Sequence, residues 1–175
     1  MHPLTKYSAR AAAYEILLRV ERESSYASEL LHSRPNSALS APDHALATEL
    51  VMGVLRWRSV LDSAISLHSS LSLPKLDLEI LIALRLGVYQ LMFLTRIPAH
   101  AAINESVELV KRARKRSAAA FVNAVLRKIS SRTLSPPAVD HSSAEALAVS
   151  TAHPQWMVDR WCKSYGLAAA EQICR

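Results

Sequence analysis

The side chains best suited to a chemical role are five cations that fall within six consecutive residues. They lie between two segments of helical period, so each helix can bury its apolar face while the cations stay outside the core. Ser117 is expected to cap the second helix, which would place free backbone N–H groups beside the cations. We expect no nearby acid to neutralise this run, and the pattern indicates a surface that binds the phosphates of RNA. The five cations are Lys111, Arg112, Arg114, Lys115 and Arg116.

Four residues beyond this run are candidates for the same surface. Arg127 and Lys128 are expected to extend the positive charge, although the C-terminus of a helix also favours cations. The amide of Asn123 is suited to hydrogen-bond the edge of a base, and the alternative is an ordinary exposed or capping asparagine. Phe121 is suited to stack under an unpaired base, but an aromatic residue at this spacing is more often part of the core.

A second candidate patch lies near the N-terminus, where Lys6, Arg10 and Tyr14 line one flank of the first helical segment. An exposed arginine beside a tyrosine can bind RNA by charge and by stacking. The alternative is a helix flank that packs against a neighbouring segment.

For Asn104 and Glu105 we expect a structural role. Asn104 would bond the backbone at the start of a helix, and the charge of Glu105 would suit the positive end of the same helix dipole.

The sequence contains no pattern typical of a catalytic or metal-binding site. The seven histidines lack ligand spacing, and Cys162 and Cys174 form no CxxC pair, which suits a reduced, cytoplasmic setting. The N-terminus has no apolar segment like that of a signal peptide, and the apolar segment 76–94 carries three charges. We therefore expect no catalytic residues, no metal and no membrane span.

The composition predicts an all-α fold. Half of the 175 residues are apolar, and glycine occurs only three times. The formal net charge of +6 is uneven, because residues 1–132 hold 18 Lys and Arg against 11 Asp and Glu, whereas residues 133–175 hold 3 against 4. A basic N-terminal part favours a polyanionic partner such as nucleic acid.

Apolar residues at helical spacing predict an ordered series of helices, with Asp43 as the cap of the third. A prolonged apolar segment marks the helix that the others pack against, and the Pro136-Pro137 pair marks a linker. The predicted helices cover about residues 5–22, 26–32, 43–57, 59–68 and 76–94, followed by two more after Pro98.

These elements predict a helical domain over residues 1–132, a linker over 133–143, and the start of a truncated region over 144–175. We expect the last region to be too small for a core of its own and to belong to a larger part outside this sequence. Trp156 and Trp161 are expected to seal a packing surface against that part.

The order of the segments over about residues 5–132 resembles the NusB family. The resemblance is most specific at residues 102–105 (AINE) and 121–123 (FVN), where the family patterns AINEAVELAK and FVNGVL recur. The segments RWRSVLD, LRLGVYQL and RIPAHAAINESV, with AHPQWMVDRWCKSYG in the tail, are more similar to the N-terminal region of RsmB-type rRNA cytosine-5 methyltransferases than to the free antitermination factor.

This resemblance implies a compact bundle of about seven helices that binds RNA, expected to be small-subunit rRNA, for a C-terminal methyltransferase domain. That domain would bind S-adenosylmethionine and is absent from this sequence, which has neither a glycine-rich donor loop nor the Pro-Cys nucleophile motif. We therefore expect no enzyme activity and no cofactor in this chain alone. One alternative is a NusB-type transcription antitermination factor that binds leader RNA and a ribosomal protein. Another is a protein-interaction adaptor.

Overall fold

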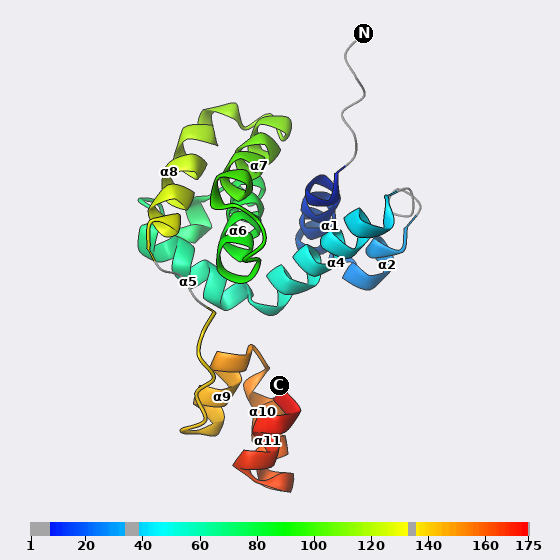
Figure 1. The fold of residues 1–175 in the computed structure, drawn as a ribbon, viewed down its shortest axis with the longest axis vertical. Helices are drawn as coiled ribbons and strands as arrows, with labels where there is room; N and C mark the ends of the chain where they lie inside the picture. The colour runs from blue at the N-terminus through cyan, green and yellow to red at the C-terminus, as the bar shows by residue number, and fades with distance from the viewer. Residues whose placement is uncertain (1–7, 34–38, 133–135, 175) are drawn as a thin grey trace. The chain divides into compact units, whose positions relative to one another are not determined.

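The computed structural model describes residues 8–33, 39–132 and 136–174. Every regular element within these ranges is a helix, so the predicted all-α fold is confirmed. The chain divides into two compact units, residues 1–134 and 135–175, and Figure 1 shows the helices of each unit.

The described part of the first unit contains seven α-helices, which agrees with the expected bundle. Their apolar faces meet in one core. The helices are α1 (Ala9–Glu23), α2 (Ala27–Leu31), α4 (Ala41–Arg56), α5 (Arg58–His68), α6 (Leu78–Phe93), α7 (Ala99–Arg112) and α8 (Ala119–Ser130), with 3₁₀ turns η1 (Leu73–Lys75) and η2 (Arg116–Ala118).

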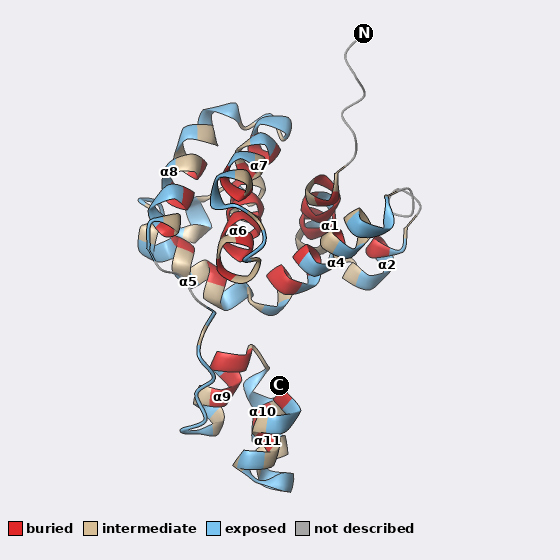
Figure 2. Cartoon of the chain, viewed as in Figure 1, coloured by how far each residue is buried: buried red, intermediate tan, exposed pale blue. Residues whose placement is uncertain are grey.

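The other helices of this unit pack on α6, which contacts α1, α4, α5, α7 and α8. Its residues are buried around nearly the whole circumference, as the red ribbon in Figure 2 shows. Ile82, Leu84, Leu86 and Val88 have no exposed surface. A helix that is apolar on all sides is stable in water only inside other elements, so the predicted central helix at 76–94 is confirmed.

Arg85 places a charge inside this core, where only 3% of its surface is exposed. Its Nε and Nη2 donate to the two carboxylate oxygens of Asp62 at 2.7 and 2.8 Å, and its Nη1 donates to Glu21 at 3.0 Å. The paired bonds to Asp62 match the planar fork of a guanidinium group. Because Glu21 belongs to α1 and Asp62 to α5, this network joins three helices.

Helices α4 and α6 approach closely at Gly53. A Cβ added to Gly53 would lie 2.0 Å from Cζ of Tyr89. The Tyr89 hydroxyl donates to the Glu49 carboxylate at 2.6 Å, and its ring stacks on Phe93 with 4.9 Å between centroids. Glycine is therefore required here because the tyrosine ring occupies the space of any side chain.

The starts of two helices are set by serine side chains. Ser40 caps α4, because its Oγ accepts a hydrogen bond from the backbone N–H of Asp43 at 3.3 Å. The prediction that Asp43 is the cap is wrong; it lies in the first turn, where its charge suits the helix dipole. Ser8 caps α1 in the same way, through the N–H of Ala11. The predicted start of α1 at residue 5 lies outside the described residues.

The second unit contains α9 (Ala144–Thr151), α10 (Gln155–Tyr165) and α11 (Leu167–Cys174). The expectation that this region has no core of its own is wrong, because its three helices enclose a small apolar cluster. The three helices contact one another mainly through small side chains, so their backbones can lie close together. Its buried members are Leu147, Ala148, Val158, Ala170 and Cys174.

The two tryptophans of α10 have different environments. Trp161 packs on the small core of the second unit and lies edge to face with His153, with 5.7 Å between ring centroids. Trp156 is 64% exposed. The expectation that both residues seal a packing surface against a part outside this sequence stays a prediction, and the contacts that the structure shows for Trp161 lie within its own unit.

The Arg85 network predicts a large difference between two arginines that share Glu21. Arg85→Met should lower the free energy of unfolding by about 3 kcal/mol, because it leaves the largely buried Asp62 carboxylate without its partner and Glu21 with Arg58 alone. Arg58 also bonds Glu21, at 3.2 Å, but its side chain is 53% exposed, so Arg58→Met should change stability by less than about 1 kcal/mol. Urea denaturation of both variants measures the difference, and equal losses would contradict this account.

The close approach at Gly53 predicts a coupled pair. Gly53→Ala should destabilise the protein by about 1–3 kcal/mol, because the methyl group displaces the ring of Tyr89. In a Tyr89→Ala background the same change should be neutral or stabilising, since alanine favours a helix over glycine by about 1 kcal/mol. A double-mutant cycle from thermal unfolding measures this coupling. Additive effects would show that the ring does not limit the residue at position 53.

Candidate nucleic-acid interface

The chain reverses direction between α7 and α8 through residues 113–118. Arg114 has a φ of 61°, a left-handed conformation, and its N–H bonds the carbonyl of Lys111 at 3.1 Å. The 3₁₀ turn η2 follows, and α8 begins at Ala119. The prediction that Ser117 caps α8 is wrong, because Ser117 lies inside η2 and the cap position is taken by Ala118, which has no side-chain cap bond.

Two of the five cations on this turn are paired with acids. Lys111 Nζ lies 2.7 Å from Glu108 in the same helix, and Lys115 Nζ lies 2.8 Å from Asp77, the residue before α6. Its hydrogen bond to Asp77 raises the pKa of Lys115 above its ordinary value. The expectation that no acid neutralises this run is therefore wrong for both lysines.

The three arginines of the turn are exposed. Among the described residues, no acid lies within ion-pair distance of Arg112, Arg114 or Arg116. Arg112 is the last residue of α7, Arg114 is the left-handed residue, and Arg116 is the first residue of η2. All three therefore lie on the segment where the chain reverses direction. We call these three residues the turn arginines. Their guanidinium groups are available to an outside anion.

Arg127 and Lys128 are also exposed but do not extend this surface. Both lie near the C-terminal end of α8, and Arg127 lines a cavity with Ala99 and His100 at the start of α7. The 14 residues of α7 separate that end of the hairpin from the turn, a distance of about 20 Å at 1.5 Å per residue. The cations therefore form two groups, at opposite ends of the α7–α8 hairpin, and the expectation that Arg127 and Lys128 extend the charge of the turn is wrong.

Asn123 and Phe121 both have partners within the protein. The Asn123 side-chain oxygen accepts a hydrogen bond from Arg127 Nε at 3.2 Å, so this amide holds the arginine in place. Phe121 is half-buried and packs against the main core. The core role that its spacing favoured is therefore the one that the structure shows, while its availability to a base is limited to one part of the ring.

The second predicted patch is largely built into the fold. Arg10 is half-buried, and its Nε donates to the side-chain oxygen of buried Gln90 at 2.7 Å. Tyr14 is 6% exposed, and its hydroxyl donates to the backbone carbonyl of Glu79 at 3.0 Å. Burial raises the pKa of this hydroxyl. The expectation of an exposed arginine beside a tyrosine is wrong, and the alternative of a packed flank holds for Arg10 and Tyr14, because α1 packs against α6. Lys6 lies outside the described residues.

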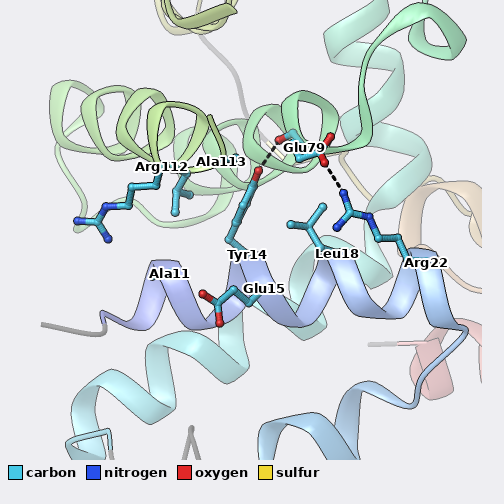
Figure 3. Close-up of a pocket in the computed structure, with 9 residues that line it drawn as sticks. Ala11, Tyr14, Glu15, Leu18, Arg22, Glu79, Arg112 and Ala113 are labelled. Atoms are coloured by element: carbon cyan, nitrogen blue, oxygen red, sulfur yellow. Dashed lines mark hydrogen bonds and ion pairs between the residues drawn. The ribbon is translucent and has the colours of Figure 1, made fainter. Parts of the chain in front are cut away.

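A cavity of about 500 Å³ lies between α1, the start of α6 and the end of α7. Its apolar lining includes Leu18 and Tyr14, and Glu15 and Arg112 are among its charged members. Figure 3 shows Tyr14 reaching across to Glu79, which also pairs with Arg22 of α1. Arg112 is thus one of the turn arginines and also lines this groove.

Sequence reasoning missed this groove. It is assembled from segments about 60 and 30 residues apart in the chain, and helical periodicity describes each helix separately. Arg22 and Glu79 each look like an ordinary helix-end charge in the sequence, and no local signal indicates that they pair.

Among the described residues, no group of three or more His, Cys, Asp or Glu side chains is placed to hold a metal ion. In the same part of the chain, no helix combines the length and the apolar character needed to cross a membrane.

Residues 7–131 match the model of the NusB family. The "Probable ribosomal RNA small subunit methyltransferase B" of Bacillus subtilis (strain 168) is 37% identical over 174 residues, covering 98% of this chain but 38% of the relative. The "Transcription antitermination protein NusB" of Ruminiclostridium cellulolyticum is 30% identical over 128 residues, covering 70% of this chain and 86% of the relative. The chain therefore spans well under half of the methyltransferase relatives that it matches.

Solved structures agree with the sequence comparisons. A crystal structure of antitermination factors NusB and NusE in complex with dsRNA aligns with a TM-score of 0.64 at 30% identity, over 70% of this chain and 93% of that one. The T. maritima NusB structure aligns with a TM-score of 0.65 at 26% identity, over 71% and 89%. The predicted resemblance is confirmed, and the chain belongs to the NusB family.

Proposed function

We propose that this chain is an RNA-binding module that docks rRNA for a methyltransferase domain in a longer protein. The observation that carries the proposal is the set of turn arginines, three exposed guanidinium groups on one chain reversal without an acid partner among the described residues. A guanidinium fork can hold two phosphate oxygens at once. Backbone phosphates would supply most of the affinity, and a few base contacts would supply specificity.

The relatives support the two parts of this proposal. A NusB structure of the same fold was solved in complex with dsRNA, and the methyltransferase relatives act, by their names, on small-subunit rRNA. Because the chain spans only 38% of the Bacillus subtilis relative, the catalytic step and the S-adenosylmethionine site belong, on this proposal, to a domain outside the sequence. The RNA contact is therefore the part of the function that this chain would supply, in the cytoplasm.

The groove between α1, α6 and α7 favours a second candidate function, that of a protein-interaction adaptor. An apolar floor with charged residues around it is the usual anatomy of a protein-binding surface. One structural relative was solved together with the protein NusE. A ribosomal-protein partner of that kind would use the groove and leave most of the turn exposed.

Removal of the turn arginines tests the RNA proposal. The Arg112→Gln/Arg114→Gln/Arg116→Gln variant should weaken rRNA binding and lower the log–log salt slope by about 2, since each lost single-strand phosphate contact removes about 0.7. A control variant, Arg19→Gln/Arg58→Gln/Arg160→Gln, removes the same charge from exposed positions elsewhere. Filter binding from 50 to 300 mM salt, roughly the range in which such contacts are screened, measures the affinity and the salt slope of both variants. Equal slopes in the two variants would refute the assignment of this surface.

A binding titration without RNA tests the adaptor. If the groove receives a protein, purified NusE should bind the wild-type chain in calorimetry, and Glu15→Lys should weaken that binding about tenfold by placing a cation beside Arg112. Glu145→Lys in the second unit is the matched control, because it makes the same change at an exposed position outside the groove. No heat of binding with the wild-type chain would exclude this candidate for NusE.

A further inference from the structure

The other end of the α7–α8 hairpin holds a separate cavity of about 460 Å³. His100, Ile103 and Asn104 line it from α7, and Arg127 and Ser130 line it from α8. Its volume lies within the range of about 300–1,000 Å³ that is typical of pockets for small organic groups. The turn arginines lie about 20 Å away along α7, so this cavity is distinct from the proposed phosphate surface.

The charged lining of this cavity is wholly basic among the described residues. Arg127 is exposed, and only its Nε is used within the described part of the protein, in the bond to Asn123. Its terminal nitrogens can therefore meet an anion while the Asn123 bond limits the motion of the side chain. No Asp or Glu lines the cavity, and exposed Lys128 and Arg132 follow on the same segment. This charge balance suits a phosphate group.

Asn104 contributes a group that can recognise a base. The expectation that it bonds the backbone at a helix start is wrong, because it is the sixth residue of α7 and is exposed. Within the described residues its amide has no hydrogen-bond partner, so its oxygen and its NH₂ group are both available. An asparagine amide can pair with the N6 and N7 groups of adenine in a bidentate manner. Ile103, one residue before it, also lines the cavity, but it belongs to the main core and is only 6% exposed.

We propose that this cavity binds one unpaired nucleotide of the RNA, with adenine preferred. Arg127 would hold the phosphate, and Asn104 would bond the edge of the base. Proteins that read RNA sequence commonly do so on unstacked bases of single strands, which a cavity of this kind can enclose. The inference rests on the proposed RNA-binding function, and it adds a base-reading element to the phosphate contacts of the turn.

Fluorescence anisotropy with 12-nucleotide oligo(A), oligo(C) and oligo(U) tests the proposal. The wild-type chain should bind oligo(A) about tenfold more tightly than the other two, which is the usual scale for one bidentate base contact. Asn104→Leu should abolish this preference with little change for oligo(U), and Asn104→Gln should restore part of it. Arg127→Gln should weaken all three oligonucleotides and lower the salt slope by about 0.7. Arg19→Gln, which removes the same charge from α1, should leave the affinities and the salt slope unchanged.

The outcomes separate the two proposals. If no RNA binds to the wild-type chain, the proposed function itself is wrong. If RNA binds and the turn variant loses it, but the Asn104 and Arg127 variants behave as the wild type, only the cavity assignment is overturned. Adenosine monophosphate is titrated alongside, and binding as tight as that of oligo(A) would show a site for free nucleotides and overturn the assignment to an RNA strand. Circular dichroism of each variant confirms that the fold is retained.

Discussion

A guanidinium group inside an apolar bundle must be neutralised, and in this protein Arg85 meets that requirement with carboxylates from two other helices. The helix that carries it is buried on nearly every side, so its position determines where its neighbours pack. Charge pairing gives α1 and α5 a defined register against α6, which apolar contact alone specifies less strictly. The hairpin of α7 and α8 packs on the same helix, and both groups of exposed cations are carried by that hairpin.

The hairpin explains why residues close in sequence act at separate places. Lys111 and Arg127 are 16 positions apart in the chain, yet antiparallel packing sends them to opposite ends of two paired helices. The two lysines of the turn pair with acids while the three arginines do not, so the available charge at the turn comes from guanidinium groups. One end of the hairpin thus offers open charge, and the other offers a cavity with an amide and an arginine.

Composition was sufficient to predict the fold class and periodicity the central helix, because a helix that is apolar on all sides must be buried by other elements. The family motifs added the arrangement of the bundle. What could not be predicted was contact between distant segments: the pairing of Lys115 with Asp77, the burial of Tyr14 against Glu79, and the groove beside them. Two cap predictions also failed, because Ser117 lies inside the 3₁₀ turn η2 and because Ser40, not Asp43, caps α4.

The left-handed residue of the turn is an arginine, where glycine would adopt the same φ without steric strain. In this conformation the Cβ of an L-residue lies close to the following carbonyl oxygen, which costs about 1–2 kcal/mol. The turn between α7 and α8 is therefore less stable with Arg114 than with glycine, but the arginine places a cation at the end of the hairpin. Local thermodynamic stability and the capacity to attract an anion are in opposition at this single position.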